Sequence, residues 1–312
     1  MSPLRQALDD YLAVRRALGF KLVETGYALR RFVEFAEAQG ASVITTQLAL
    51  AWAQQPAQGD PVVWARRLGF VRRFARHCIG LDPATEVPPN QLLPAKVRRK
   101  PPYLYSDTEI LRLLAAAKEL RSRTGLRAPT ISTLLGLMAV TGMRTREATN
   151  LDRDDVGLAA GVITIRQSKF GKSRCVPVAH STQTALEQYQ VCRDRLCPHP
   201  PTAAFFVTAY GMRVMRVTPF TLRNNFIKLS RLIGLRKPSD RRGPRLHDLR
   251  HSFAVRTLLS WYKQGIDVER QLPRLATYLG HAHVHDTYWY LSAAPELLQA
   301  AAVRLAGADF ER

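Results

Sequence analysis

The stretch "PTISTLLGLMAVTGMRTRE", residues 129–147, changes from apolar to charged within a few positions. Its first part is nearly apolar, and a helix that is apolar on all sides lies inside a core. Arg144 follows this segment directly, and Glu147 comes three residues later. We therefore predict a domain built around a buried helix at 129–142, with a charged pair where that helix ends.

The segments around this helix predict a mainly helical domain with a small sheet, an α+β fold over residues 104–312. Ser106 and Glu109 have the spacing of a capping box that begins a helix. Pro295 can open a last helix, which we expect at about 295–308 as a C-terminal tail.

One stretch departs from the helical pattern. Residues 161–178, "GVITIRQSKFGKSRCVPV", contain two arms rich in β-branched residues around a polar turn with a glycine, which is typical of a β-hairpin. Lys169 falls near the tip of this hairpin. A further short extended piece is expected at 204–211.

The N-terminal third predicts a bundle of short helices. Apolar residues recur at helical spacing over 3–20 and 26–41. A third helix is expected to end near Trp52, and a fourth covers 60–81. We therefore expect a helical domain at residues 1–85.

Residues 86–103 are rich in proline and predict a linker between the two domains. Positive side chains cluster in the fourth helix and in this linker, where they suit the phosphates of duplex DNA, although a solvated surface explains them too. The residues predicted to contact DNA in these two places are Arg66, Arg67, Arg72, Arg73, Lys96, Arg98, Arg99 and Lys100.

The charge of the chain points to a polyanionic partner. Lysine and arginine total 46 against 25 acidic residues, which gives a net charge of +21. Such an excess is typical of proteins that bind nucleic acid. No apolar run reaches the length of a membrane span, and the first residues lack a secretion signal. We expect no membrane association and a place in the cytoplasm or on the nucleoid.

Four cysteines, at 78, 175, 192 and 197, lack paired CxxC spacing. A disulfide scaffold or a zinc site is therefore not expected, and buried reduced thiols are the interpretation that we favour.

Two C-terminal stretches carry residues with chemical potential. In "RLHDLRHSFAVRTLL", residues 245–259, His247 and Arg250 are three apart and share a helix face. The stretch "LGHAHVHDTYWYL", residues 279–291, holds three histidines and two tyrosines. On a strand these histidines would suit a metal, but the region is rich in helix, so we expect no metal here.

The ordered set "TGMRTRE", a hairpin lysine, "HDLRH" and "LGHAHVHDTYWY" resembles the tyrosine recombinases, the class of phage-integrase and Xer-like enzymes. The resemblance covers the whole chain and implies a helical domain that binds core DNA, a basic linker and a catalytic domain. It also implies strand exchange through a 3′-phosphotyrosine, without a cofactor.

The resemblance implies a role for each candidate residue. Arg144 and Arg250 would bind the phosphate, Lys169 would be the general acid with Lys172 as a nearby competitor, and His247 and His281 would assist at the phosphate. Glu147 would support Arg144. Tyr290 has the family spacing from His281 and would be the nucleophile rather than Tyr288. His251 is expected in a packing role, and Arg241 and Arg242 either contact phosphate or are solvated.

Two other classes fit the sequence less well. One is a DNA-binding regulator without catalysis, and the other is a type IB topoisomerase. The expected partners are double-stranded DNA and further copies of the chain, as a tetramer in the synaptic complex, with sister recombinases or accessory proteins as further candidates. The biological setting is either integration and excision of a mobile element or the resolution of dimers.

Overall fold

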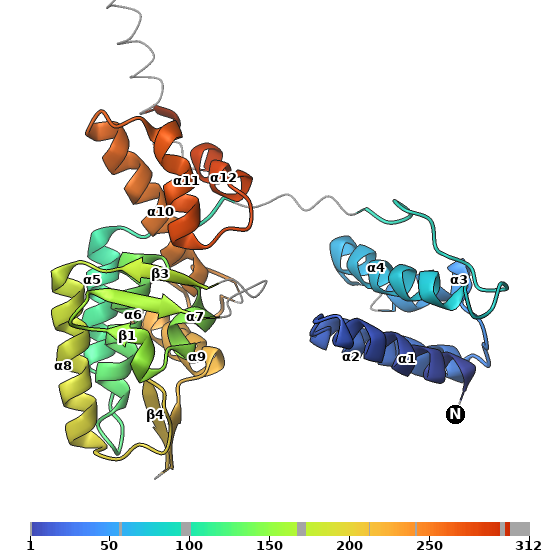
Figure 1. The fold of residues 1–312 in the computed structure, drawn as a ribbon, viewed down its shortest axis with the longest axis horizontal. Helices are drawn as coiled ribbons and strands as arrows, with labels where there is room; N and C mark the ends of the chain where they lie inside the picture. Colours follow the sequence, from blue (N-terminus) through green and yellow to red (C-terminus); the bar gives the residue numbers. More distant parts are fainter. Residues whose placement is uncertain are drawn as a thin grey trace, which may run out of the picture. The chain divides into compact units, whose positions relative to one another are not determined.

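A computed structural model describes residues 2–55, 58–94, 101–166, 173–211, 213–240, 242–293 and 297–299 (Figure 1). The chain divides into two compact units, which we call the N-terminal unit (residues 1–100) and the C-terminal unit (residues 101–312).

The N-terminal unit contains the four helices that the sequence predicted, α1 (Pro3–Ala17), α2 (Val23–Ala38), α3 (Thr46–Ala53) and α4 (Pro61–Cys78). Side chains of Ser2, Thr45 and Asp60 cap three of them by accepting hydrogen bonds from backbone N–H groups of the first turn. Leucine, phenylalanine and tryptophan side chains from all four helices form one core.

Residues 86–94, which the sequence placed in the linker, pack against the helices of the N-terminal unit. The Glu86 backbone N–H donates to the carbonyl oxygen of Ile44, and the Glu86 carboxylate accepts from the Thr46 N–H at 2.7 Å. Arg72 of α4 donates to the carbonyl oxygen of Pro88 at 2.7 Å. The remaining predicted DNA contacts of this region, Lys96, Arg98, Arg99 and Lys100, lie outside the described residues.

The C-terminal unit is built around α6 (Arg127–Thr141), the helix that the apolar run predicted. It packs against α5 (Asp107–Lys118), α8 (His180–Leu196) and α10 (Leu246–Lys263). The other helices are α7 (Thr145–Asn150), the short 3-10 helix η1 (Arg153–Asp155), α9 (Pro219–Leu232), α11 (Val268–Leu279) and α12 (His285–Ala293). Helices α10, α11 and α12 contact one another at one end of this unit (Figure 1).

Two small antiparallel sheets complete the unit, so the α+β prediction is confirmed. The first has the order β1 (Val156–Gly157), β2 (Val162–Ile165) and β3 (Arg174–Pro177), and the second pairs β4 (Val207–Tyr210) with β5 (Arg213–Arg216). Strands β2 and β3 are the arms of the predicted hairpin, with Ile165 opposite Arg174. The connection between them carries Lys169 and Lys172, which lie outside the described residues.

The cysteines, the start of the C-terminal tail and the lengths of the helices bear on three further expectations from the sequence. Cys78 is buried, but Cys175 is exposed and the other two cysteines are half-buried, so the expectation of buried thiols was wrong for Cys175. Leu297, from the start of the predicted tail, packs in a core with α10 and α11 of its own chain. Among the described helices, none is long and apolar enough to cross a membrane.

Candidate active site

Side chains from several elements of the C-terminal unit converge where α6 and α11 end. Both helices end at a glycine with positive φ, Gly142 at 62° and Gly280 at 71°. The last carbonyl oxygens of a helix receive no hydrogen bond from N–H groups of that helix, and they form the negative end of its dipole. Here the carbonyl oxygens of Gly142, Leu279 and Gly280 accept hydrogen bonds from arginine side chains.

Arg250 of α10 is the most buried of these arginines, with 2% of its surface exposed. It donates from Nη1 to the carbonyl oxygen of Gly142 at 2.9 Å and from Nη2 to that of Leu279 at 2.8 Å. Burial and the nearby charge of Arg144 lower the pKa of Arg250 to about 10. The group therefore stays charged at neutral pH, and its position is fixed by the ends of two helices.

Arg144 lies at the N-cap of α7 and is held by a neighbouring carboxylate. Its Nη1 donates to Oε1 of Glu147 at 2.8 Å, its Nη2 donates to the carbonyl oxygen of Gly280 at 2.8 Å, and its backbone N–H donates to Oε2 of Glu147 at 2.9 Å. Glu147 is only 7% exposed. Burial alone would raise the pKa of Glu147, but hydrogen bonds from two arginines outweigh it and lower the pKa to about 2.

Tyr290 of α12 faces this cluster, whereas Tyr288 faces away from the core. Tyr290 is 2% exposed and Tyr288 is 41% exposed. The Tyr290 ring stacks against His281 with 6.0 Å between centroids, and Nδ1 of His281 lies 2.7 Å from Oγ1 of the buried Thr287. Burial raises the pKa of Tyr290, while the charge of Arg250 and a hydrogen bond from it act in the opposite direction.

Two further histidines follow from the tyrosine: His251 contacts it, and His247 contacts His251. His251 contacts Tyr290, with 5.5 Å between ring centroids, and also contacts Trp289 at 5.2 Å. His247 is exposed and meets the His251 ring edge-on at 4.7 Å. Although much of the residue's surface is exposed, neighbouring side chains partly remove water from its ring, and this desolvation, followed by the positive charge of Arg250, lowers the pKa of His247 to about 4.

The pKa of His281 and of His251 is likewise lowered to about 4. Burial is the main cause for both, and the second cause is the charge of Arg250 for His281 and the neighbouring His247 for His251. All three imidazoles are therefore neutral at neutral pH, so each can donate one hydrogen bond and accept another.

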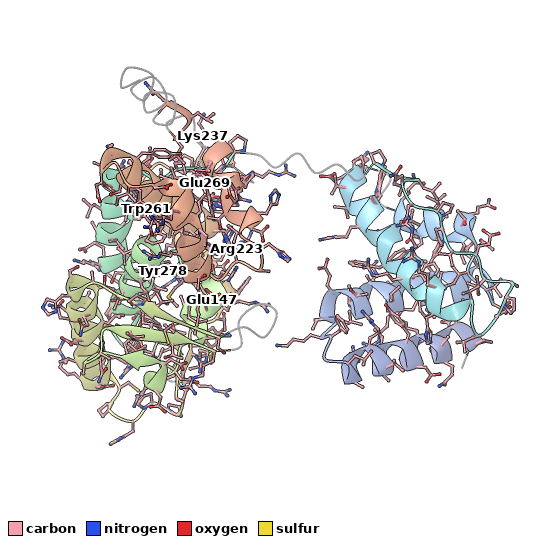
Figure 2. All side chains as sticks on the ribbon, turned by 45° about the horizontal axis from the view of Figure 1, so that its top comes forward. Glu147, Arg223, Lys237, Trp261, Glu269 and Tyr278 are labelled. Atoms are coloured by element: carbon pink, nitrogen blue, oxygen red, sulfur yellow. The ribbon has the colours of Figure 1, made fainter. Side chains whose placement is uncertain are left out.

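The sequence did not single out Arg174, which the structure places in the middle of this cluster. Arg174 is the first residue of β3, its side chain is 10% exposed, and it donates from both terminal nitrogens to Glu147. Its Nε donates to the carbonyl oxygen of Tyr278 at 2.8 Å. Figure 2 labels Glu147 and Tyr278, the two residues that Arg174 joins. In the sequence, Arg174 is distinguished from other arginines only by its position directly after the basic connection of the hairpin.

Several predicted site residues are not placed in this cluster. Lys169, Lys172 and Arg241 lie outside the described residues, and Arg242 is exposed. The proposed roles of these residues stay predictions.

The four arginines of α4 that were predicted to contact DNA have partners within the N-terminal unit. Two of them lie over aromatic rings, one forms an ion pair, and one bonds to backbone carbonyls. The pairs are Arg67 over Trp52, Arg73 over Phe70, Arg66 with Glu24, and Arg72 with Pro88 and Pro89. Arg72 therefore has a structural role besides any contact with phosphate.

The histidine-rich stretch is not arranged as a strand. His281 lies in the turn after α11, His283 is exposed in that turn, and His285 is the exposed first residue of α12. Among the described residues, no group of three histidine, cysteine or acidic side chains is arranged to hold a metal ion.

Fold and site together define a class: mainly helical domains in which arginines, histidines and a tyrosine from several helices lie together. The model of the phage integrase family matches residues 104–296. Over 308 residues the chain is 48% identical to a protein of Sinorhizobium fredii named "Putative integrase/recombinase y4rB", with 98% of each chain covered. The chain belongs to the phage integrase family, the tyrosine recombinases.

Solved structures show the same fold at low identity. The Tn1549 transposon integrase in complex with transposon right end DNA is 16% identical with a TM-score of 0.67, over 98% of this chain and 100% of that one. A lambda integrase tetramer bound to a Holliday junction is 19% identical with a TM-score of 0.59, over 90% of this chain and 77% of that one.

Proposed function

We propose that this protein is a site-specific DNA recombinase that cuts and rejoins DNA through a 3′-phosphotyrosine on Tyr290. The observation that carries this proposal is the place of Tyr290, buried beside Arg250 and stacked on His281. A tyrosine held beside a fixed cation is suited to attack a phosphodiester that the cation binds.

Arg144 and Arg250 would bind the non-bridging oxygens of the scissile phosphate. Each guanidinium has five N–H donors, and the backbone bonds of Arg250 use one on each terminal nitrogen, which leaves donors for a phosphate. Charge grows on these oxygens in the transition state, and donors that are already fixed stabilise it without reorganisation. The helix-end carbonyls would provide that fixation.

The chemical step would exchange one phosphoester bond for another. The Tyr290 oxygen attacks the phosphorus, the bond to the 5′-oxygen breaks, and the 3′-phosphate becomes attached to the tyrosine. The phenol proton passes to a neutral imidazole, for which we assign His247, and the leaving 5′-oxygen takes a proton from Lys169. His281 would donate to the phosphate through Nε2, since Thr287 engages its Nδ1.

We assign DNA binding to both units, with residues 1–85 as a separate helical domain and 86–103 as its connection, whose first part, 86–94, packs on that domain. The net charge of +21 supports this assignment, as does the DNA-bound state of the integrases that share the fold. Strand exchange needs four active sites on two duplexes, so we propose a tetramer on DNA. Integration, excision and dimer resolution all use this chemistry.

The proposal is tested by finding the DNA site and then trapping the covalent complex. Bound fragments are selected from random DNA, and the selected site is built with a nick just beyond the cleavage position, so that the short fragment with the free 5′-hydroxyl leaves after cleavage. The wild-type protein and the variant Tyr288→Phe should both form a covalent complex that resists SDS, whereas Tyr290→Phe should bind the same DNA without forming it. A complex that survives in Tyr290→Phe and disappears in Tyr288→Phe would refute the assignment.

The same experiment separates the alternatives. Binding without a covalent complex in the wild-type protein would indicate a regulator, and relaxation of supercoiled DNA without a partner site would indicate a topoisomerase. We propose that the tail after Gln299 docks onto a neighbouring copy and so holds the tetramer together. Truncation after Gln299 tests this, because it keeps Leu297 in its own core. This truncation should leave binding to one site unchanged and impair the joining of two sites.

A further inference from the structure

Arg174 links three parts of the site through directed hydrogen bonds. Nη1 and Nη2 donate to Oε1 and Oε2 of Glu147 at 3.0 and 2.9 Å, a bidentate pairing in which both planar groups are fixed relative to each other. Nε donates to the carbonyl oxygen of Tyr278 at 2.8 Å. These bonds use all three nitrogens of the side chain.

Glu147 transmits the position of Arg174 to Arg144. The same two carboxylate oxygens that accept from Arg174 also accept from Nη1 and from the backbone N–H of Arg144. A carboxylate held by only one of the two arginines could rotate, and Arg144 would rotate with it. The charge of Arg250 also acts on this pair, so three cations surround one carboxylate.

Arg174 also occupies the space beside Gly280. A Cβ atom at Gly280 would lie 2.7 Å from Nη1 and 2.9 Å from Cζ of Arg174, so only glycine permits this contact. Arg174 contacts the end of α11 and the turn after it, residues 278–281, which we call the 278–281 turn. The carbonyl oxygens of this turn also accept hydrogen bonds from Arg144 and Arg250. His281 is the last residue of that turn.

We infer that Arg174 is a positioning residue: it holds Glu147 and the 278–281 turn in place, and through them it orients Arg144, Arg250 and His281 toward the phosphate. This inference deepens the proposed function and rests on it. Arg174 is also the first residue of β3, so it ties the arm of the hairpin that carries Lys169 to the same turn.

The test compares Arg174→Lys and Arg174→Ala with a matched control, Arg166→Lys. Arg166 lies just after β2, at the other end of the same hairpin connection, and its side chain is 64% exposed in an ion pair with Asp155. On the selected nicked DNA, we expect covalent attachment to slow about 100-fold in Arg174→Ala and about 10-fold in Arg174→Lys. A loss of about 100-fold is typical when a catalytic group is displaced by about 1 Å. The control should match the wild type.

Two readouts separate positioning from other roles. The affinity for DNA should stay within about twofold, because the donors of Arg174 point into the protein; a loss of affinity as large as the loss of rate would overturn the inference. Between about pH 5 and 7, above the pKa values of about 4 for His247 and about 2 for Glu147, the wild-type rate should stay constant. Over the same range the rate of Arg174→Ala should fall as the pH falls, since Glu147 remains buried but loses its main partner and its pKa rises. An equal loss at every pH would indicate a merely structural role.

A third readout needs no DNA and is therefore independent of the proposed function. Hydrogen exchange of the backbone N–H groups of Gly280 and His281, which are bonded at the end of α11, should be faster in Arg174→Ala and unchanged in Arg166→Lys. Unchanged exchange in Arg174→Ala would overturn the inference. If the wild type forms no covalent complex, the proposed function fails, and exchange alone decides whether Arg174 holds the turn.

Discussion

Replacing Glu147 by glutamine should destabilise the C-terminal unit by about 3 kcal/mol at pH 7. The carboxylate is 7% exposed and accepts from Arg144 and Arg174, and its pKa is lowered from an ordinary value of 4.5 to about 2. A difference of about 2.5 pKa units corresponds to about 3 kcal/mol of folding free energy. Breaking buried ion pairs in other proteins costs about 3–5 kcal/mol, which agrees with this value.

The effect depends on pH in a direction that the structure fixes. The folded pKa of Glu147 is lower than the unfolded one, so its contribution is complete above pH 4.5 and is lost as the pH falls toward 2. The difference between wild type and Glu147→Gln should therefore be constant from pH 6 to 8 and fall to about half at pH 3. Glutamine is neutral and has the same size as glutamate, so any change in packing contributes equally at every pH.

Calorimetry and urea unfolding of the full chain measure this difference. A loss of about 3 kcal/mol lowers the melting temperature of a unit of about 200 residues by roughly 6–12 °C. The transition of the N-terminal unit provides an internal reference, and Glu187→Gln, an exposed change on α8, should alter stability by less than about 0.5 kcal/mol. A difference below about 1 kcal/mol at pH 7, or one of equal size at pH 3 and pH 7, would refute the reasoning.

Three further changes have expected outcomes. Gly280→Ala should lower the melting temperature and slow covalent attachment, because the residue has a φ of 71° and its Cβ would lie 2.7 Å from Arg174. Thr287→Val should cost about 1–2 kcal/mol of unfolding free energy and shift the His281 ring signals in NMR spectra, since the 2.7 Å bond to Nδ1 is lost. Arg72→Ala should destabilise the N-terminal unit by about 1–2 kcal/mol in urea unfolding, because two backbone carbonyls lose a charged donor. Unchanged stability in any of the three would contradict the corresponding contact.

The choice between the two tyrosines shows what periodicity can and cannot decide. Residues two apart on a helix point in nearly opposite directions, so the sequence already required that only one of Tyr288 and Tyr290 could face the core. Family spacing favoured Tyr290. The structure buries Tyr290 against Arg250 and leaves Tyr288 exposed, a result of how α12 packs on α10 and α11.

For Arg72 and Arg174, by contrast, the sequence did not predict the hydrogen-bond partners. Arg72 belonged to a basic helix face, and nothing in its neighbourhood predicted that it would bond to carbonyl groups 16 and 17 residues later. Arg174 was one basic residue in a hairpin arm. Its partners Glu147 and Tyr278 lie 27 and 104 residues away in the chain, so only the folded arrangement brings them together.

By itself, the sequence determined the four N-terminal helices, the buried helix α6, the arms of the hairpin, the order of the motifs and the side chains that share a face of these elements. These features depend on local spacing, because backbone geometry repeats over a few residues. The tertiary structure decided which donor meets which acceptor: the helix-end carbonyls for Arg144 and Arg250, and the carboxylate of Glu147 for Arg174. Hydrogen bonds require groups within about 3 Å, and packing between distant elements sets such distances.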